Sequence, residues 1–504
     1  MAKNHHQNHP LSNLYSFCHL LFLISSISSI AFLYWTHHHP SPCHVPDPIS
    51  SLQSSQGQPH FSGHLGSFSS AWNHLSFSSE PPRKQLNIAL FVKRWPEVNR
   101  AGGLERHALT LHLLLARRGH VTHVFTASSS SSVASIHPNI HFHLSDPNPN
   151  GLLNPAAAWV QYEALNSIHP FDVVHSESVA LGHSWAKKLK NVAVSWHGIA
   201  YETMHSDIVQ DLVRPPGEQR PAELERRLAE RTFRIIEEVK FFQHYTHHVA
   251  TSDYVGDVLK RIYMIPEERV HVILNGVNEG VFKQNFEEGR AFRKKYGVPE
   301  SASLVLGMSG RLVKDKGHPI MFEALSQIFR ENEMFGKQVC LVVVGDGPWG
   351  DRYKELGPNM LILGPMEQTE IARFYNAIDI FVHPTLRGQG FDQTPLEAMI
   401  TGKPVMATRF AATTRSAIVS SEMGYIFSPT VPSLKETLYR VFQDGREVLE
   451  KKGEVARQRA VRLFTATKMA AAFERLFLCI SANKGEGDAD YCKYPLQSDK
   501  IQAL

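Results

Sequence analysis

The sequence predicts an α/β protein of two doubly wound parallel domains, and three observations support this. First, a chain of 504 residues is long for one domain and suits two. Second, strand-like apolar runs alternate with helical patterns, which is typical of βαβ units in a parallel sheet. Third, glycine-bearing loops follow several of these runs, where open α/β sheets bind ligands.

Composition excludes several classes of protein. The net charge is only +4, so the chain offers no strong case for binding nucleic acid. Its five cysteines are scattered without a C-x-x-C pattern, and we therefore expect neither a zinc site nor a disulfide scaffold. Cys340, within an apolar strand pattern, is expected to be a small buried residue. The histidines at 37–39 suit a solvated stem better than a metal site.

The N-terminal region predicts a membrane anchor. After a polar tail (residues 1–13), Leu14 to Trp35 runs without a charged side chain and is long enough to cross a bilayer as one helix. Tyr34 and Trp35 suit the membrane interface. A cleaved signal or transit peptide and a buried helix are the alternatives. Residues 36–84, rich in Ser, His and Pro, read as a flexible stem.

The first domain is expected at 85–295 and opens with a strand over Leu86–Val92. A loop containing Gly102 and Gly103 and a helix over Leu104–Arg118 follow, then a strand over Val121–Phe125. Glycines at this first turn would let a ligand approach the backbone.

Further strand-like runs continue this domain. One of them, 191–197, ends in His197, at the carboxyl end where α/β sheets bind ligands. A charged helix over Pro221–Val239 is expected to be a solvated face, or else to shape an acceptor pocket. Residues 283–300, charged and rich in turn formers, are expected to connect the domains. The remaining strands are predicted at 172–175, 248–251 and 269–274.

The second domain is expected at 296–480, followed by a polar tail (481–504). A strand over Ser303–Met308 leads to a loop that carries Arg311 and Lys316, two cations that can neutralise a diphosphate. A helix is predicted at 319–330 and another at 370–377, with helices near 433–443 and 467–479 closing the domain. Strands are predicted at 339–344, 360–363 and 379–382.

The stretch from Phe381 to Thr408 predicts strand, glycine-bearing loop, helix, tight turn and strand. Thr394 and Pro395 suit a helix start with a hydroxyl cap, and Gly402 suits its end. Such a loop directs backbone N–H groups and a helix N-terminus toward one point, which favours an anion such as phosphate.

Several of these segments carry a resemblance to one family. The run QGFDQTPLEAMITGKPV resembles the E-x7-E donor signature of retaining glycosyltransferases of family four with the GT-B fold, with Gln389 in place of the first Glu and Glu397 as the second. The run GRLVKDKG is similar to the family's GRL-x-x-x-KG. The GGLERH loop resembles GG-x-x-RH, and the pattern as a whole resembles a plant-type, membrane-anchored member.

The resemblance implies two Rossmann-like domains facing across a cleft, which transfer a sugar from a nucleotide diphosphate sugar, UDP- or GDP-linked, with retention of configuration. The acceptor would be a glycan, a lipid or a small molecule, no metal or other cofactor would be needed, and the anchor would place the protein in the Golgi or endoplasmic reticulum membrane. The residues implied as catalytic are His197, Arg311, Lys316 and Glu397. Those implied to bind the donor are Gly102, Gly103, Gln389, Gly390, Phe391, Asp392, Gln393 and Thr394.

Two departures from the family pattern keep alternatives open. Gln389 lacks the charge of the usual Glu, and Ala411-Ala412 with Arg415 stand where Gly-Gly and a Glu are usual. A catalytically inactive nucleotide-sugar-binding protein or scaffold is therefore the alternative function. A sugar-nucleotide epimerase of the same fold would need an acid/base carboxylate pair, which the sequence does not suggest.

Overall fold

The computed structural model describes residues 63–96, 103–128, 136–214, 217, 219–388, 391–410, 412–482 and 490–493. The predicted membrane span Leu14–Trp35 and the predicted stem as far as residue 62 lie outside this set. Residues 63–84 were also predicted as flexible stem, and this part of the prediction is wrong. Their apolar side chains Leu65, Trp72 and Leu75 are buried in the core of the first domain. Among the described residues no helix is both long and apolar enough to cross a bilayer.

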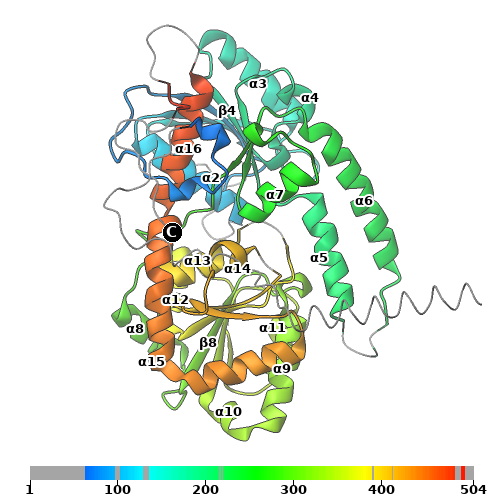
Figure 1. Ribbon diagram of the computed structural model, residues 1–504, viewed down its shortest axis with the longest axis vertical. Helices are drawn as coiled ribbons and strands as arrows, with labels where there is room; N and C mark the ends of the chain where they lie inside the picture. Colours follow the sequence, from blue (N-terminus) through cyan, green and yellow to red (C-terminus); the bar gives the residue numbers. More distant parts are fainter. Residues whose placement is uncertain are drawn as a thin grey trace, which may run out of the picture. The chain divides into compact units, whose positions relative to one another are not determined.

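Two parallel sheets form the frame of the molecule (Figure 1). The first has seven strands in the order β3-β2-β1-β4-β5-β6-β7. The order reverses direction beside β1, which is the topological switch point where such sheets bind ligands. Its strands are β1 (Asn87–Phe91), β2 (Val121–Ala127), β3 (Ile140–Ser145), β4 (Val173–Glu177), β5 (Val192–Trp196), β6 (His247–Ala250) and β7 (Val270–Val272).

Helices connect these strands. The α2 helix buries an apolar stripe that includes Leu111 and Leu115. The α6 helix, predicted at 221–239, packs along α5 and leaves most of its side chains exposed. The helices of this half are α2 (Gly103–Arg117), α3 (Pro155–Ile168), α4 (His183–Ala186), α5 (Ala200–Leu212), α6 (Glu223–Phe242) and α7 (Asp253–Arg261).

The second sheet has six strands in the order β10-β9-β8-β11-β12-β13, again all parallel. Its central strands are buried on both faces, as a doubly wound sheet requires, and Cys340 lies there fully buried as expected. The strands are β8 (Leu304–Ser309), β9 (Val339–Val344), β10 (Met360–Ile362), β11 (Ile380–His383), β12 (Val405–Thr408) and β13 (Gly424–Phe427).

Two helices depart from the expected organisation. The segment 283–300 is not a bare connection, because it contains α8, which packs on α12 through Gly289, where a Cβ would lie 2.4 Å from Asn376 O. The last helix, α16, packs against α2 of the first domain (Figure 1). The helices of this half are α8 (Phe286–Tyr296), α9 (His318–Glu331), α10 (Glu333–Gln338), α11 (Trp349–Lys354), α12 (Gln368–Ala377), α13 (Gln393–Ile400), α14 (Thr413–Ser416), α15 (Val431–Leu463) and α16 (Ala466–Ser481).

Candidate functional site

Two loops at the carboxyl ends of β8 and β11 pack backbone against backbone. Gly317 has φ of +80°, and a Cβ there would lie 1.8 Å from the carbonyl oxygen of Pro384. The Leu386 N–H donates to the carbonyl of Asp315 at 2.9 Å. This close approach requires glycine at position 317 and fixes the cation-bearing loop against the loop that precedes α13.

A partly buried ion pair joins these loops. Lys316 Nζ lies 2.7 Å from Asp392 Oδ2, and His383 Nε2 lies 3.1 Å from the same oxygen. Burial alone would raise the pKa of Asp392, but Lys316 and His383 hold it far below its usual range. Lys316 is therefore anchored by Asp392, whereas Arg311 is exposed at the start of the same loop.

The helix that follows begins two residues earlier than predicted, since Pro395 was expected at its first position. It starts at Gln393 with Asp392 at the N-cap position, so the predicted capping role of the Thr394 hydroxyl is wrong. Asp392 makes no capping hydrogen bond, because its carboxylate is occupied by Lys316. The first N–H groups of α13 thus lack a side-chain cap beside a lysine, which is the setting that favours a bound anion. The helix ends before Gly402, whose φ is +79°, as predicted.

Glu397 lies one turn into α13 and is 2% exposed. The Tyr375 hydroxyl donates to its Oε2 at 2.8 Å, and Arg106 Nη1 of α2 lies 3.5 Å from its Oε1. Burial raises the pKa of Glu397, while Arg106 and Tyr375 oppose that rise. The carboxylate therefore sits at the contact between the two domains.

His197 follows β5 and is held by a carboxylate that sequence reasoning missed. Its Nε2 lies 2.5 Å from Oε2 of Glu177, the last residue of β4. The other oxygen, Oε1, lies 3.0 Å from His107 Nδ1, on the first turns of α2. The three ligand atoms are close enough together that a metal ion could be held there. Because Glu177 is far from both histidines in the sequence, only the strand order β1-β4-β5 shows their proximity.

Side chains of the first domain hold the loop that precedes α13 in the second domain. Asn275 Nδ2 donates to the Phe391 carbonyl at 2.6 Å, and Ser206 Oγ donates to the Leu386 carbonyl at 2.7 Å. The Phe391 ring is buried against Phe464, so its side chain fixes the loop. These hydrogen bonds join the two halves of the predicted site.

Arg415, which departs from the family pattern, has a partner in the first domain. Its Nη2 lies 2.9 Å from Oδ2 of Asp257 on α7. Next to it, Ser416 Oγ donates to Asp253 Oδ2 at 2.7 Å. The cation thus contributes to the contact between α14 and α7.

Some predicted site residues lie outside the described part of the chain. These are Gly102, Gln389, Gly390 and also Ala411. Gly103 is the first residue of α2, with open space where a Cβ would be, and Gln393 and Thr394 are half-buried in the first turn of α13. The structure therefore brings together Lys316, Asp392 and the start of α13, and separately His197 with Glu177 and His107.

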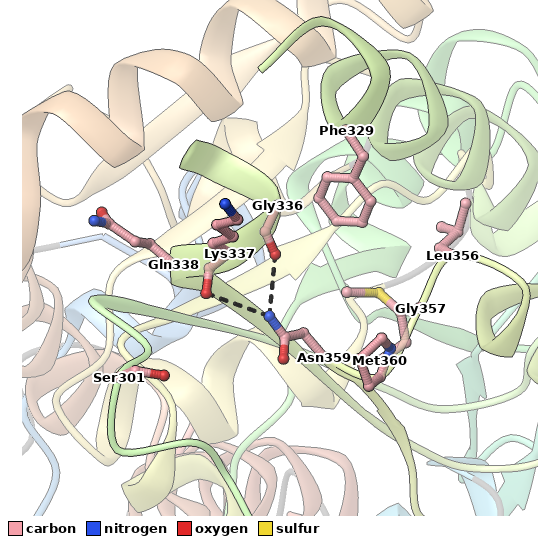
Figure 2. A pocket seen from close by; sticks show the side chains of 10 residues that line it. Ser301, Phe329, Gly336, Lys337, Gln338, Leu356, Gly357, Asn359 and Met360 are labelled. Carbon is pink, nitrogen blue, oxygen red and sulfur yellow. Dashed lines mark hydrogen bonds between the residues drawn. The ribbon is translucent and has the colours of Figure 1, made fainter. Parts of the chain in front are cut away.

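A cavity of about 600 Å³ lies at the opposite edge of the second sheet (Figure 2). Its lining includes Gln338 and Asn359, which precede β9 and β10. Asn359 Nδ2 donates to the Gly336 carbonyl at 3.0 Å, so this polar side chain already has a partner. The cavity borders the amino ends of the strands, away from Arg311 and Lys316, and we do not assign it to the site.

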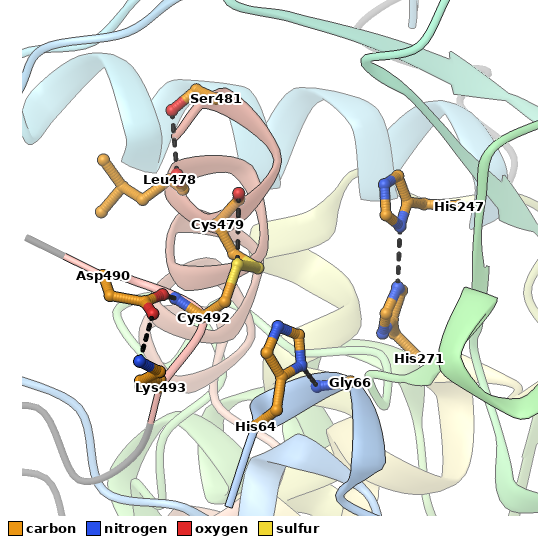
Figure 3. The surroundings of a disulfide bond; sticks show 10 residues. All are labelled: His64, Gly66, His247, His271, Leu478, Cys479, Ser481, Asp490, Cys492 and Lys493. Carbon is orange, nitrogen blue, oxygen red and sulfur yellow. Dashed lines mark hydrogen bonds and ion pairs between the residues drawn. A yellow bond between two sulfur atoms is a disulfide. The ribbon is translucent and has the colours of Figure 1, made fainter. Parts of the chain in front are cut away.

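A disulfide between Cys479 and Cys492 was not expected from the cysteine pattern (Figure 3). It ties the end of α16 to the segment 490–493, whose Cys492 carbonyl accepts a hydrogen bond from Leu65 N–H at 2.7 Å. His64 lies beside the pair, with its Nδ1 bonded to Gly66 N–H at 3.0 Å. The disulfide therefore holds the segment 490–493 beside α16, and the Leu65 hydrogen bond ties that segment to the start of the described chain.

Comparison with known proteins gives two family matches. Residues 101–280 match a model described as Glycosyltransferase Family 4, and residues 303–444 match one described as Glycosyl transferases group 1. A D-inositol 3-phosphate glycosyltransferase of Xylanimonas cellulosilytica is 27% identical over 341 residues, which cover 62% of this chain and 76% of that protein.

Solved structures share the fold. Sucrose-phosphate synthase from Thermosynechococcus elongatus superposes with a TM-score of 0.62 at 19% identity, covering 78% of this chain and 98% of that one. HepE from Anabaena, solved in complex with UDP-glucose, gives a TM-score of 0.58 at 18% identity over 78% of this chain and 99% of that one. With parallel sheets in both halves and these matches on both, the chain is a GT-B glycosyltransferase of the family 4 and group 1 type.

Proposed function

We propose that this enzyme transfers a sugar from a UDP- or GDP-linked donor to a hydroxyl of a glycan, lipid or small-molecule acceptor, with retention of configuration and without a metal ion. The observation that supports it most is the packing of the Lys316 loop against the start of α13. Arg311, Lys316 and the uncapped N–H groups of α13 would receive the donor diphosphate.

Charge develops on the diphosphate oxygens as the glycosidic bond breaks. Cations and helix N–H groups fixed beforehand stabilise that charge without reorganisation. These groups supply the positive charge that a divalent metal provides in other transferases. Glu397 would accept hydrogen bonds from the ribose hydroxyls, and His197 would contact the sugar.

Retention without a protein nucleophile requires the acceptor to attack from the side of the leaving group. The carboxylates nearest the proposed phosphate site are already engaged, since Asp392 pairs with Lys316 and Glu397 with Tyr375 and Arg106. We therefore assign proton removal from the acceptor hydroxyl to the leaving phosphate. Gln389, which replaces a carboxylate in the family pattern, would bias the choice of donor sugar.

The test uses the full-length protein purified in detergent. A panel of UDP- and GDP-sugars is supplied with a membrane extract as acceptor, and release of nucleoside diphosphate is measured. We expect release from one donor that depends on acceptor and survives EDTA, and a product whose anomeric NMR signal matches that of the donor. Activity lost to EDTA and restored by Mg²⁺ or Mn²⁺ would reject the metal-free mechanism. Donors that raise the melting temperature without turnover would identify a binding pseudoenzyme.

We also propose that Leu14–Trp35 anchors the enzyme in a Golgi or endoplasmic reticulum membrane, with the catalytic domains in the lumen. The Cys479–Cys492 disulfide supports the lumenal side, because such bonds persist in oxidising compartments. Carbonate extraction should leave the protein in the membrane pellet. In intact microsomes, protease should spare the catalytic domains. Release into the supernatant would contradict the anchor, and degradation would contradict the orientation.

A further inference from the structure

Glu177 bridges two histidines that come from different elements. It is 1% exposed, and its two carboxylate oxygens contact separate imidazoles, with Oε2 at 2.5 Å from His197 Nε2 and Oε1 at 3.0 Å from His107 Nδ1. The His107 and His197 rings meet edge to face with centroids 4.6 Å apart. One buried carboxylate thus fixes the orientation of both rings.

The backbone after Glu177 supports a special role for this position. Ser178 has φ of +52°, and among the described residues only Met264 shares a positive φ without being glycine. Ser176 Oγ donates to the Ser178 carbonyl at 2.8 Å and accepts from Leu181 N–H at 2.9 Å, which holds this turn. Strained backbone of this kind concentrates at functional sites.

The carboxylate determines which nitrogen of each ring carries a proton. Burial alone would raise the pKa of Glu177, but His107 and His197 hold it well below its usual range, so the group is an anion and can only accept hydrogen bonds. Both facing nitrogens must therefore be donors, Nδ1 of His107 and Nε2 of His197. That assignment leaves Nδ1 of His197 as the nitrogen available to a ligand.

We propose that Glu177 is a positioning residue, which holds His197 as the Nε2–H form so that Nδ1 accepts a hydrogen bond from a hydroxyl of the donor sugar. His107 steadies the second oxygen, so the carboxylate cannot turn away from His197. This role rests on the proposed transferase function. The same arrangement, in which a carboxylate fixes the tautomer and orientation of an imidazole, recurs where histidine must present one nitrogen to a partner.

The matched control is Glu474 on α16. It is 6% exposed, its Oε1 lies 2.8 Å from His120 Nε2, and Arg118 Nε donates to it at 2.7 Å, so it is also a buried carboxylate held by a histidine and a second partner. It belongs to the contact of α16 with α2. Glu474→Gln should therefore lower the melting temperature and leave kcat/KM close to that of the wild type.

The test measures kcat/KM of the full-length enzyme in a mutant cycle. We expect Glu177→Gln to lower it by about 10- to 100-fold, the effect of losing a hydrogen bond to a charged group. In a His197→Ala background, the same change should have little further effect, because Glu177 acts through His197. The proposal would be overturned if Glu177→Gln lowered kcat/KM as much in the His197→Ala background as in the wild type. It would also be overturned if Glu474→Gln lowered kcat/KM as much as Glu177→Gln does.

A second measurement does not depend on turnover. In proton NMR of the full-length protein, the His197 Nε2–H that faces Glu177 should give a far-downfield signal, absent in His197→Gln and in Glu177→Gln but present in Glu474→Gln. If this signal is present but the enzyme shows no turnover, the proposed transferase function is contradicted and the positioning of His197 by Glu177 is not. If the signal persists in Glu177→Gln, the positioning role is overturned. If the wild type binds Zn²⁺ stoichiometrically and Glu177→Gln abolishes that binding, the positioning role is also overturned and the group is a metal site.

Discussion

Arg106 Nη1 lies 3.5 Å from Glu397 Oε1, and this ion pair joins the first turns of α2 to α13 in the other domain. The next residue, His107, contacts Glu177 and through it His197. One turn of α2 therefore links the carboxylate proposed to bind ribose with the histidine proposed to bind the sugar. A change at this turn is expected to affect donor binding from both sides.

Arg106→Gln should alter the pH dependence of donor binding. Burial raises the pKa of Glu397 and Arg106 lowers it, so loss of the guanidinium lets the carboxyl protonate at higher pH. If the ionised form accepts the ribose hydroxyls, the donor KM should begin to rise at a higher pH than in the wild type. Donor KM measured over roughly pH 5 to 8 tests this. The control is Arg117→Gln, an exposed change on the same helix. If the pH dependence of the donor KM is the same in Arg106→Gln as in the wild type, the assignment of Glu397 to ribose binding is contradicted.

Gln389→Glu should change the donor preference. Glutamine keeps one carbonyl acceptor but adds an NH2 donor and removes the charge of the usual Glu. We expect wild type to tolerate a donor sugar with an acceptor group at that position, such as a carboxylate, and Gln389→Glu to disfavour it. Relative kcat/KM across several donors measures this. Equal preferences in both proteins would show that Gln389 does not face the sugar.

Loss of the Cys479–Cys492 disulfide should destabilise the first domain. The bond closes a loop with a sequence separation of 13, for which chain entropy predicts about 3 kcal/mol. The double variant Cys479→Ser, Cys492→Ser should melt at a lower temperature than the wild type. Reductant should lower the wild-type melting temperature and leave that of the double variant unchanged. A reductant effect of equal size on both proteins would mean that the bond is not the cause.

Mild acid should destabilise the fold through its buried histidines. Burial lowers the pKa of His175 to about 4, of His248 to about 3 and of His318 to about 4. In the unfolded chain the pKa of these histidines is about 6.5. Between this pH and the lower pKa of the folded state, the unfolded chain binds protons that the folded protein does not. Stability should therefore fall as the pH falls from about 6.5 toward about 4. Melting temperatures at about pH 7 and about pH 5 test this. His318→Gln should make the melting temperature depend less on pH. A wild-type melting temperature at the lower pH that equals or exceeds the one at the higher pH would contradict the prediction.

The sequence predicts the regular elements well where a continuous apolar run marks a strand. Strands β1, β8, β9 and β11 and helices α2 and α9 lie within a few residues of their predicted positions. Two parallel sheets were also expected, because a chain in which strands alternate with helices has few other topologies open to it. The strands β3 (six residues) and β13 (four residues) were missed, because runs this short and only partly apolar carry too little periodic signal.

Contacts between distant segments could not be predicted. At the start of α13, Asp392 occupies the N-cap position but pairs with Lys316 of the neighbouring loop, and local sequence does not show this contact. From local sequence alone, the hydroxyl of Thr394 is a reasonable cap. Glu177 lies two residues beyond the strand predicted at 172–175 and was not singled out, since its histidine partners are brought to it only by the order of strands. The packing of α16 on α2 likewise follows from apolar contacts that no local pattern contains.

Binding of the free nucleoside diphosphate tests the central claim most directly. Isothermal titration of UDP and of GDP into the full-length protein should show one of them binding at a single site without added metal. Affinity should fall by about tenfold or more in Arg311→Ala and in Lys316→Ala, because each removes a charge-assisted hydrogen bond to phosphate. Lys337→Ala, an exposed lysine at the opposite edge of the same sheet, should bind like the wild type. No binding of either nucleotide, or equal affinity in all four proteins, would contradict the assignment of the donor site.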